Sequence, residues 1–105
     1  GNVMLVGEEE LPAATILSSC GPGLLAAIIE ELASATARAS GLPVDRALAL
    51  ATETTAATAA YLRKTGEATG GGVTEAGVKE LRERLPGVFD EAVAAMLERY
   101  GAVGK

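Results

Sequence analysis

The stretch CGPGLLAAII, residues 20–29, carries no charged side chain over ten consecutive positions. Pro22 is tolerated in the first turn of a helix, and Gly41 is typical of the residue that follows a last turn, so we predict a helix over Pro22–Ser40. A surface helix shows polar residues at every turn, whereas the first half of this one shows none. It is too short to span a membrane, so the pattern indicates burial in an oligomer.

A second helix is predicted over Pro43–Thr65, with Gly66 after its last turn. Its apolar stripe follows the 3.6-residue period of a helix and consists of Val44, Ala47, Leu48, Ala51, Thr55, Thr58, Ala59 and Leu62. The middle of the helix, TTAATAA at residues 54–60, is small and uncharged on every side. Two faces of this helix therefore require contacts, and one protomer hardly supplies both.

Two further helices are predicted in the C-terminal third, over Thr74–Arg84 with Thr74 as the N-cap, and over Pro86–Tyr100. Leu11–Ala14 has the residues of a single helical turn. Val3–Val6 is a short β-prone run with no second strand to pair with. The predicted fold class is all-α: a four-helix domain that forms an intertwined homodimer, with a short orphan strand at the N-terminus.

The composition excludes several classes of protein. The chain has 105 residues and a mass of 10.6 kDa, which fits one small domain. It has no His and one Cys, so Ser-His-Asp catalysis, Cys-His catalysis and ordinary zinc sites cannot be built from it. The net charge of −5 argues against non-specific nucleic-acid binding. With a single thiol, no signal-peptide pattern and no transmembrane run, we expect no membrane partner and a cytoplasmic location.

The best candidate for a ligand site is the glycine-rich segment TGGGVT, residues 69–74. Its glycines expose backbone N–H groups, and the hydroxyl of Thr74 stands at the start of a helix. This combination favours an anion such as a carboxylate or a phosphate. The segment lacks the lysine of a P-loop. From the residue types alone, a flexible linker between two helices explains the segment equally well.

Three other features have both a functional and a structural explanation. Gly21-Pro22-Gly23 matches the glycine spacing of a dinucleotide-binding turn, but its neighbours do not read as strands, so a tightly packed helix start is favoured. Cys20 precedes a predicted helix N-terminus and could be a reactive thiol, although a small residue at a tight helix start accounts for it better. Glu30 and Glu31 could bring a carboxylate to an interface or could simply be solvated.

The order of these motifs resembles the C-terminal domain of the pyrroline-5-carboxylate reductase family. TILSSCGPG at 15–23 is similar to the family's T-x-L-S-G-S-G-P-A, and IEELA at 29–33 resembles its I-E-A-L-A in the same helix. GLP at 41–43 is similar to the turn before the next helix, and GGVTEAG at 71–77 resembles the substrate loop P-G-G-x-T-x-x-G. The family pattern A…T…L-x-T-G-E is represented by Ala47, Thr54, Leu62, Thr65, Gly66 and Glu67.

The resemblance implies an activity that composition does not show. Enzymes of this family reduce 1-pyrroline-5-carboxylate to proline with NAD(P)H, which an N-terminal Rossmann domain holds. Their C-terminal helical domain intertwines with a second copy, and the active site lies at that junction. The glycine-rich loop of the family holds the substrate carboxylate through backbone amides and a hydroxyl. Carried over, this substrate-binding role falls on Gly71, Gly72 and Thr74, with Thr69 in place of the family's Ser.

By the same resemblance, residues 1–14 are the end of a nucleotide-binding domain and its linker, and residues 15–105 are the dimerisation and substrate-binding domain. NAD(P)H would be held by a domain outside this chain, and the chain itself would contribute no catalytic side chain and no metal ligand. The sequence departs from the family at the loop, where Gly70 replaces a proline and the segment before it is shorter. The alternative is a free-standing, non-catalytic helical module for dimerisation or interaction.

Overall fold

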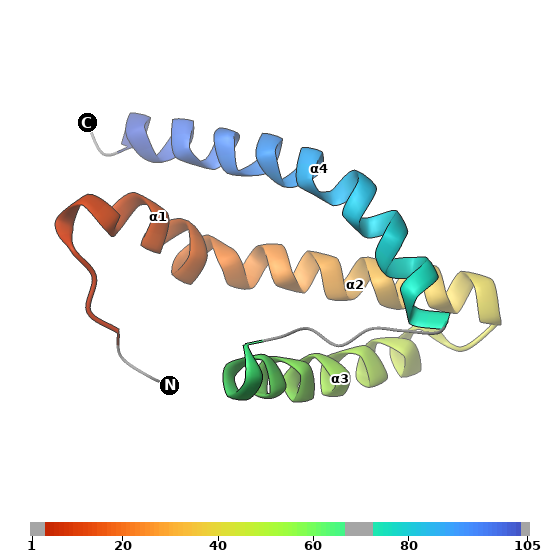
Figure 1. The fold of residues 1–105 in the computed structure, drawn as a ribbon. Coiled ribbons are helices and arrows are strands. Elements are labelled where there is room, and N and C mark those ends of the chain that lie inside the picture. Colours follow the sequence, from red (N-terminus) through yellow and green to blue (C-terminus); the bar gives the residue numbers. More distant parts are fainter. Residues whose placement is uncertain (1–3, 67–72, 104–105) are drawn as a thin grey trace. The chain divides into compact units, whose positions relative to one another are not determined.

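The computed structural model describes residues 4–66 and 73–103, apart from the side chains of residues 73–74 and 102–103. This part of the chain is helical nearly throughout and contains no strand, which confirms the all-α class (Figure 1). In chain order the elements are the 3-10 turn η1 (Glu8–Glu10), α1 (Leu11–Thr15), the π turn η2 (Ile16–Cys20), α2 (Gly21–Ser40), α3 (Val44–Thr65) and α4 (Val73–Val103).

The N-terminal segment differs from the prediction. Residues 4–7 have no regular structure, so the strand predicted over Val3–Val6 is wrong for Met4 to Val6, and Val3 lies outside the described residues. A lone strand has no ladder to join, and the described chain offers it none. The helical turn predicted over Leu11–Ala14 is confirmed as α1, with Pro12 in its first turn, where a missing N–H costs little.

The helix predicted to begin at Pro22 begins upstream of it, which corrects the expected break at Gly21-Pro22. Gly21 has helical angles, with φ −51° and ψ −46°, and α2 continues directly from η2. In a regular α-helix the ring of Pro22 would clash with the carbonyl of Ser18. The wider π turn over Ile16–Cys20 comes just before the proline and relieves that clash, so the helix runs on.

α2 and α3 end as predicted, each before a glycine in the left-handed conformation. Gly41 has a φ of 81° and Gly66 a φ of 73°. The N–H of Gly41 donates to the carbonyl of Ala37 at 2.9 Å, and the N–H of Gly66 donates to that of Leu62 at 2.8 Å. These bonds satisfy carbonyls that a helix end would otherwise leave unpaired. The start of α3 is also close to the prediction, with Pro43 as its N-cap.

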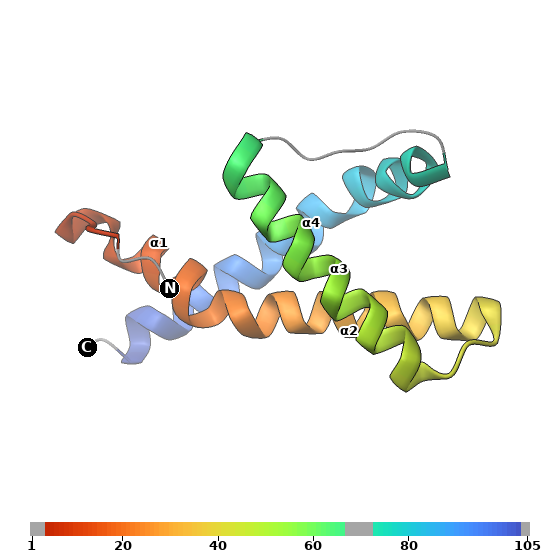
Figure 2. The ribbon, with the colours of Figure 1, turned by 90° about the horizontal axis from the view of Figure 1, so that it is seen from below.

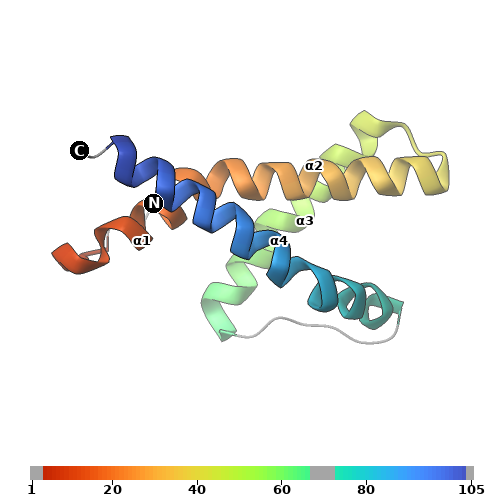
Figure 3. The same ribbon diagram turned by 90° about the horizontal axis from the view of Figure 1, so that it is seen from above.

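α4 is one helix of 31 residues, which corrects the prediction of two helices separated at Leu85 (Figure 3). Pro86 lies inside it and removes the hydrogen bond that its N–H would make to the carbonyl of Arg82. Gly87 does not adopt a positive φ, since among the described residues Gly41 and Gly66 alone do so. The helix-forming residues on both sides outweigh the lost bond, so Pro86 bends the helix and does not end it.

The chain forms two compact units, which we describe separately. One contains η1, α1, η2 and α4, and the other contains α3 and α2 from Pro22 onward. Among the described residues, the buried hydrophobic side chains are Ile16 in the first unit and Ala33 and Ala47 in the second. Most large apolar side chains are exposed, and Leu32, for example, is 61% exposed. Each protomer therefore leaves an unusual amount of apolar surface uncovered.

Replacing Gly66 by Ala should destabilise the protein by about 1 kcal/mol, because a Cβ at a φ of 73° is strained. The matched control is Gly87→Ala inside α4, where an added Cβ meets nothing within 4 Å. This control should stabilise the protein by about 0.5–1 kcal/mol, the usual gain from replacing a helical glycine. Urea unfolding of the three proteins, followed by circular dichroism, measures both effects; equal midpoints would contradict the assigned helix end.

Candidate functional site

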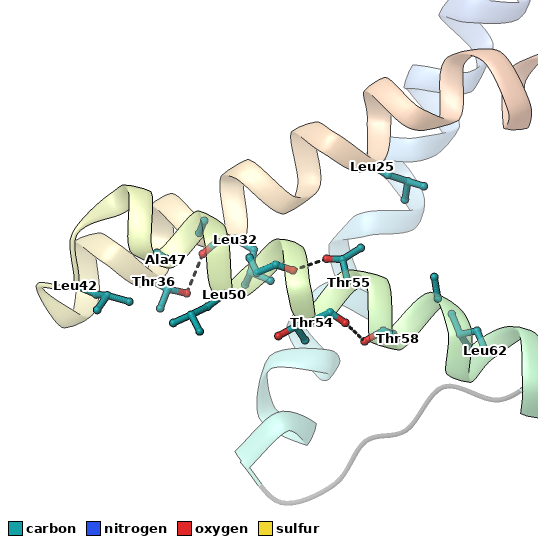
Figure 4. Close-up of a pocket in the computed structure, with 13 residues that line it drawn as sticks. Leu25, Leu32, Thr36, Leu42, Ala47, Leu50, Thr54, Thr55, Thr58 and Leu62 are labelled. Atoms are coloured by element: carbon teal, nitrogen blue, oxygen red, sulfur yellow. Dashed lines mark hydrogen bonds between the residues drawn. The ribbon is translucent and has the colours of Figure 1, made fainter. Parts of the chain in front are cut away.

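An apolar groove of about 570 Å³ lies between α2 and α3, and we call it the α2–α3 groove (Figure 4). The two helices are joined by the short turn at Gly41–Pro43 and cross at an angle rather than running side by side (Figure 2). Their buried alanines, Ala33 and Ala47, mark where they pack closely. The groove is lined by Leu25, Leu32, Ala33, Thr36, Leu42, Ala47, Leu50, Ala51, Thr54, Thr55, Thr58, Ala59 and Leu62.

No charged side chain lines this groove, and most of its hydroxyls are already bonded within their own helices. Thr36 donates to the carbonyl of Leu32 at 2.8 Å, and Thr55 donates to that of Ala51 at 2.7 Å (Figure 4). Thr58 likewise donates to Thr54 at 2.8 Å. A threonine bonded in this way presents its methyl group to the surroundings. The groove is therefore suited to packing against an apolar partner and offers no acid, base or nucleophile for catalysis.

The apolar stripe predicted on α3 matches most of its side of the groove. Ala47, Ala51, Thr55, Thr58, Ala59 and Leu62 all line it. Val44 and Leu48 do not, and they are exposed elsewhere on the helix. Leu50 and Thr54 line the groove but were not predicted. The repeat of residues three and four apart, from Ala47 through Leu50 to Thr54, is the signal that identifies them.

The predicted substrate-binding residues Thr69, Gly71 and Gly72 lie outside the described residues. Thr74 falls on the second residue of α4, which begins at Val73, so it lies within the first turn and is not the N-cap. Its side chain is also outside the description. Glu75 occupies the first turn as expected, where its charge complements the helix dipole. The anion site of the glycine-rich segment remains a prediction.

The other predicted candidates fall in different places. Gly21-Pro22-Gly23 lies inside a continuous helix, and no strand precedes it in the described chain, so it cannot form the turn of a dinucleotide-binding site. Glu30 and Glu31 are exposed on α2. Neither forms an ion pair within the described residues. The ion pair found in that part of the chain joins Glu80 and Arg84, with a nitrogen–oxygen distance of 3.7 Å. Cys20 is half-buried at the end of η2.

Two further observations bear on the expected partners. Across residues 4–66 and 73–103, no group of three or more potential metal ligands comes together. The continuous helical stretch Glu8–Ser40 is long and apolar enough to cross a membrane by length and composition alone, which corrects the expectation that no segment meets that test. Apolar helices that a partner covers in a water-soluble assembly also meet it, and the uncharged residues 11–29 explain why this one does.

Comparison with known proteins assigns the chain to a family. The family model described as pyrroline-5-carboxylate reductase dimerisation matches residues 8–103. Pyrroline-5-carboxylate reductase 3 of Bacillus subtilis (strain 168) is 34% identical over 104 residues, covering 90% of this chain and 38% of the relative. Pyrroline-5-carboxylate reductase of Arabidopsis thaliana is 37% identical over 92 residues, covering 79% of this chain and 33% of the relative. No solved structure matches.

The matched part of the chain thus spans 38% and 33% of the lengths of these two relatives. The family match runs from η1 to the end of α4, so it includes both compact units and the α2–α3 groove. An all-α chain that leaves a wide apolar groove uncovered is what a dimerisation domain requires. The chain belongs to the pyrroline-5-carboxylate reductase family and corresponds to its dimerisation domain.

Proposed function

We propose that this chain is the dimerisation and substrate-binding domain of an NAD(P)H-dependent oxidoreductase that reduces 1-pyrroline-5-carboxylate to proline. The observation that carries the proposal is the family match over residues 8–103. Residues 1–14 would lead in from a separate nucleotide-binding domain, and residues 15–105 would form the helical domain. We also propose a cytoplasmic location for the protein. We propose no nucleic-acid partner, in line with the net charge of −5.

The exposed leucines of the α2–α3 groove support an intertwined homodimer. Leu25 is 58% exposed, Leu50 51% and Leu62 42%, and all three line the groove. Burying one such side chain contributes about 1.5–3 kcal/mol, so a few of them offset the cost of ordering two chains against each other. In a two-fold dimer each protomer would insert helices into the groove of the other.

The substrate side of the proposal concerns the segment before α4. Backbone N–H groups of Gly71 and Gly72, with the hydroxyls of Thr69 and Thr74, would hold the carboxylate of the substrate. Fixing the carboxylate orients the ring so that its imine carbon faces the cofactor, which lowers the entropic part of the barrier. NAD(P)H, held by the separate domain, supplies the hydride. This chain would then contribute by binding and positioning, without a catalytic side chain.

A charge placed in the groove should break the dimer. Ala59 lines the α2–α3 groove, whereas its neighbour Ala60 does not and shares a helix face with the charged Glu53 and Lys64. Ala59→Glu should convert the dimer to a monomer, because an unpaired carboxylate cannot be buried in an apolar interface. Ala60→Glu should leave the mass at twice the chain mass of 10.6 kDa. Light scattering after size-exclusion chromatography measures the mass of each variant. If both variants remain dimers, the interface lies elsewhere on the chain.

Removing the hydroxyl of Thr74 should weaken carboxylate binding. We expect Thr74→Val to raise the dissociation constant for proline, the proposed product, by about tenfold or more, the loss of one charge-assisted hydrogen bond. Thr74→Ser retains the hydroxyl and should bind as the wild type does. Calorimetry on the three dimeric proteins measures the effect. Equal affinities in all three, or no binding at all, would favour the non-catalytic dimerisation module.

A further inference from the structure

The helical stretch Glu8–Ser40 is continuous, yet the boundary between the two compact units falls inside it, between Gly21 and Pro22. The part up to Gly21 belongs to the unit of α4, and the part from Pro22 onward belongs to the unit of α3. An uninterrupted α-helix is a rigid connection, because each turn is hydrogen-bonded to the next. The residues at the boundary therefore decide whether this connection is rigid.

Backbone hydrogen bonding is interrupted at this boundary. Pro22 has no N–H, so it cannot donate the bond that an α-helix would make to the carbonyl of Ser18. The turn just before it, Ile16–Cys20, is a π turn, in which hydrogen bonds join residues five apart instead of four. The hydroxyl of Ser18 donates to the carbonyl of Ala14 at 2.7 Å, a contact that often bends helices. Three separate features thus weaken the same part of the helix.

Two glycines flank the proline, and the local structure requires neither of them. Gly21 has helical angles, and neither Gly21 nor Gly23 is among the glycines with a positive φ in the described residues. Within those residues a Cβ added at Gly23 would meet nothing within 4 Å, and one at Gly21 would meet the carbonyl oxygen of Ile16 at an ordinary 3.7 Å. Each glycine costs about 1 kcal/mol relative to alanine inside a helix. The property that glycine adds at these two positions is backbone freedom.

We propose that residues 18–23 form a hinge, at which the helix bends so that the two compact units move as separate bodies. A hinge consists of a few residues that absorb changes in φ and ψ, and these are often small. Pro86 and Gly87 provide a contrast within the same chain. They also interrupt a helix, but α4 lies within one unit and no π turn precedes them. We expect a fixed bend at Pro86 and a variable one at Pro22.

Such a hinge has a use in assembly. Both units carry exposed apolar side chains, among them Leu25 in the unit of α3 and Leu81 in the unit of α4. A second chain that covers both surfaces selects one arrangement from those that the hinge permits. This use rests on the proposed homodimer, whereas the hinge itself does not, so either can fail without the other.

Distances between spin labels test the hinge. In a Cys20→Ser background, Ala13→Cys and Glu31→Cys place labels at exposed positions on either side of Pro22. The two positions are roughly 27 Å apart along a straight helix, which suits electron-spin distance measurements. Diluting the labelled protein with unlabelled chain keeps each measured distance within one protomer. A hinge should give a broad distribution of distances for this pair.

The matched control is a label pair across the other helical proline. Lys79→Cys and Glu98→Cys lie at exposed positions on either side of Pro86, roughly 28 Å apart along α4. We expect the distribution across Pro22 to be at least twice as wide as this one. Equal widths for the two pairs in the wild-type hinge sequence would overturn the proposal.

Two variants then locate the source of the motion. Pro22→Ala restores the missing N–H, and Gly23→Ala removes backbone freedom, so each should narrow the distribution between Ala13 and Glu31 to the width of the control pair. Pro86→Ala should leave it unchanged. Gly23→Ala keeps the test decisive if Pro22→Ala does not fold. The proposal also fails if Gly23→Ala leaves the width unchanged but lowers the mass measured by light scattering, because Gly23 is then a packing residue at an interface.

Discussion

Burial of apolar surface limits the stability of this fold, because a single protomer achieves so little of it. Ordering a residue costs about 1–2 kcal/mol of backbone entropy, and isolated helices recover only part of that cost. The described chain buries three hydrophobic side chains, Ile16, Ala33 and Ala47, two of which are alanines. α2 and α3 pack closely near their turn and leave Leu25 and Leu62 open on the groove beyond it. Assembly with a second chain therefore completes the core, which is the role of a dimerisation domain.

The same constraint explains the lengths of the helices. α3 has 22 residues and α4 has 31, far more than a core of this size needs. The backbone hydrogen bonds of a long helix form within the helix itself. A chain with little tertiary packing can therefore still pair most of its backbone N–H and C=O groups. At the ends of α2 and α3, the N–H groups of Gly41 and Gly66 pair with the carbonyls of Ala37 and Leu62. The protomer thus presents apolar faces on helices whose internal hydrogen bonds form before any partner arrives.

The sequence predicted the parts of this fold that local chemistry decides. Pro43 and Gly66 bounded α3 almost to the residue, and periodicity placed Ala51, Thr55 and Thr58 on the groove. It failed at Pro22 and Pro86, because a proline removes one backbone hydrogen bond and the neighbouring turns decide whether the helix survives that loss. Helical spacing allows Leu50 on the groove but allows Leu48 as well, and the position of α2 decides that Leu50 lines it. Residue types alone fitted either an anion site or a linker at residues 69–74; family resemblance favours the anion site, which remains a prediction.

The threonines of the α2–α3 groove affect how the chain behaves before assembly. A nascent protomer with a groove of leucine and valine would adhere to other unfolded chains. Thr36, Thr55 and Thr58 keep their hydroxyls on their own helices, yet the oxygens can still accept hydrogen bonds from water while the groove is open. When a partner covers the groove, those hydroxyls retain their intrahelical acceptors and leave no unsatisfied donor behind. Such a surface adheres less while it is open than one lined by leucine and valine alone, and it is still apolar enough to be buried once its partner arrives.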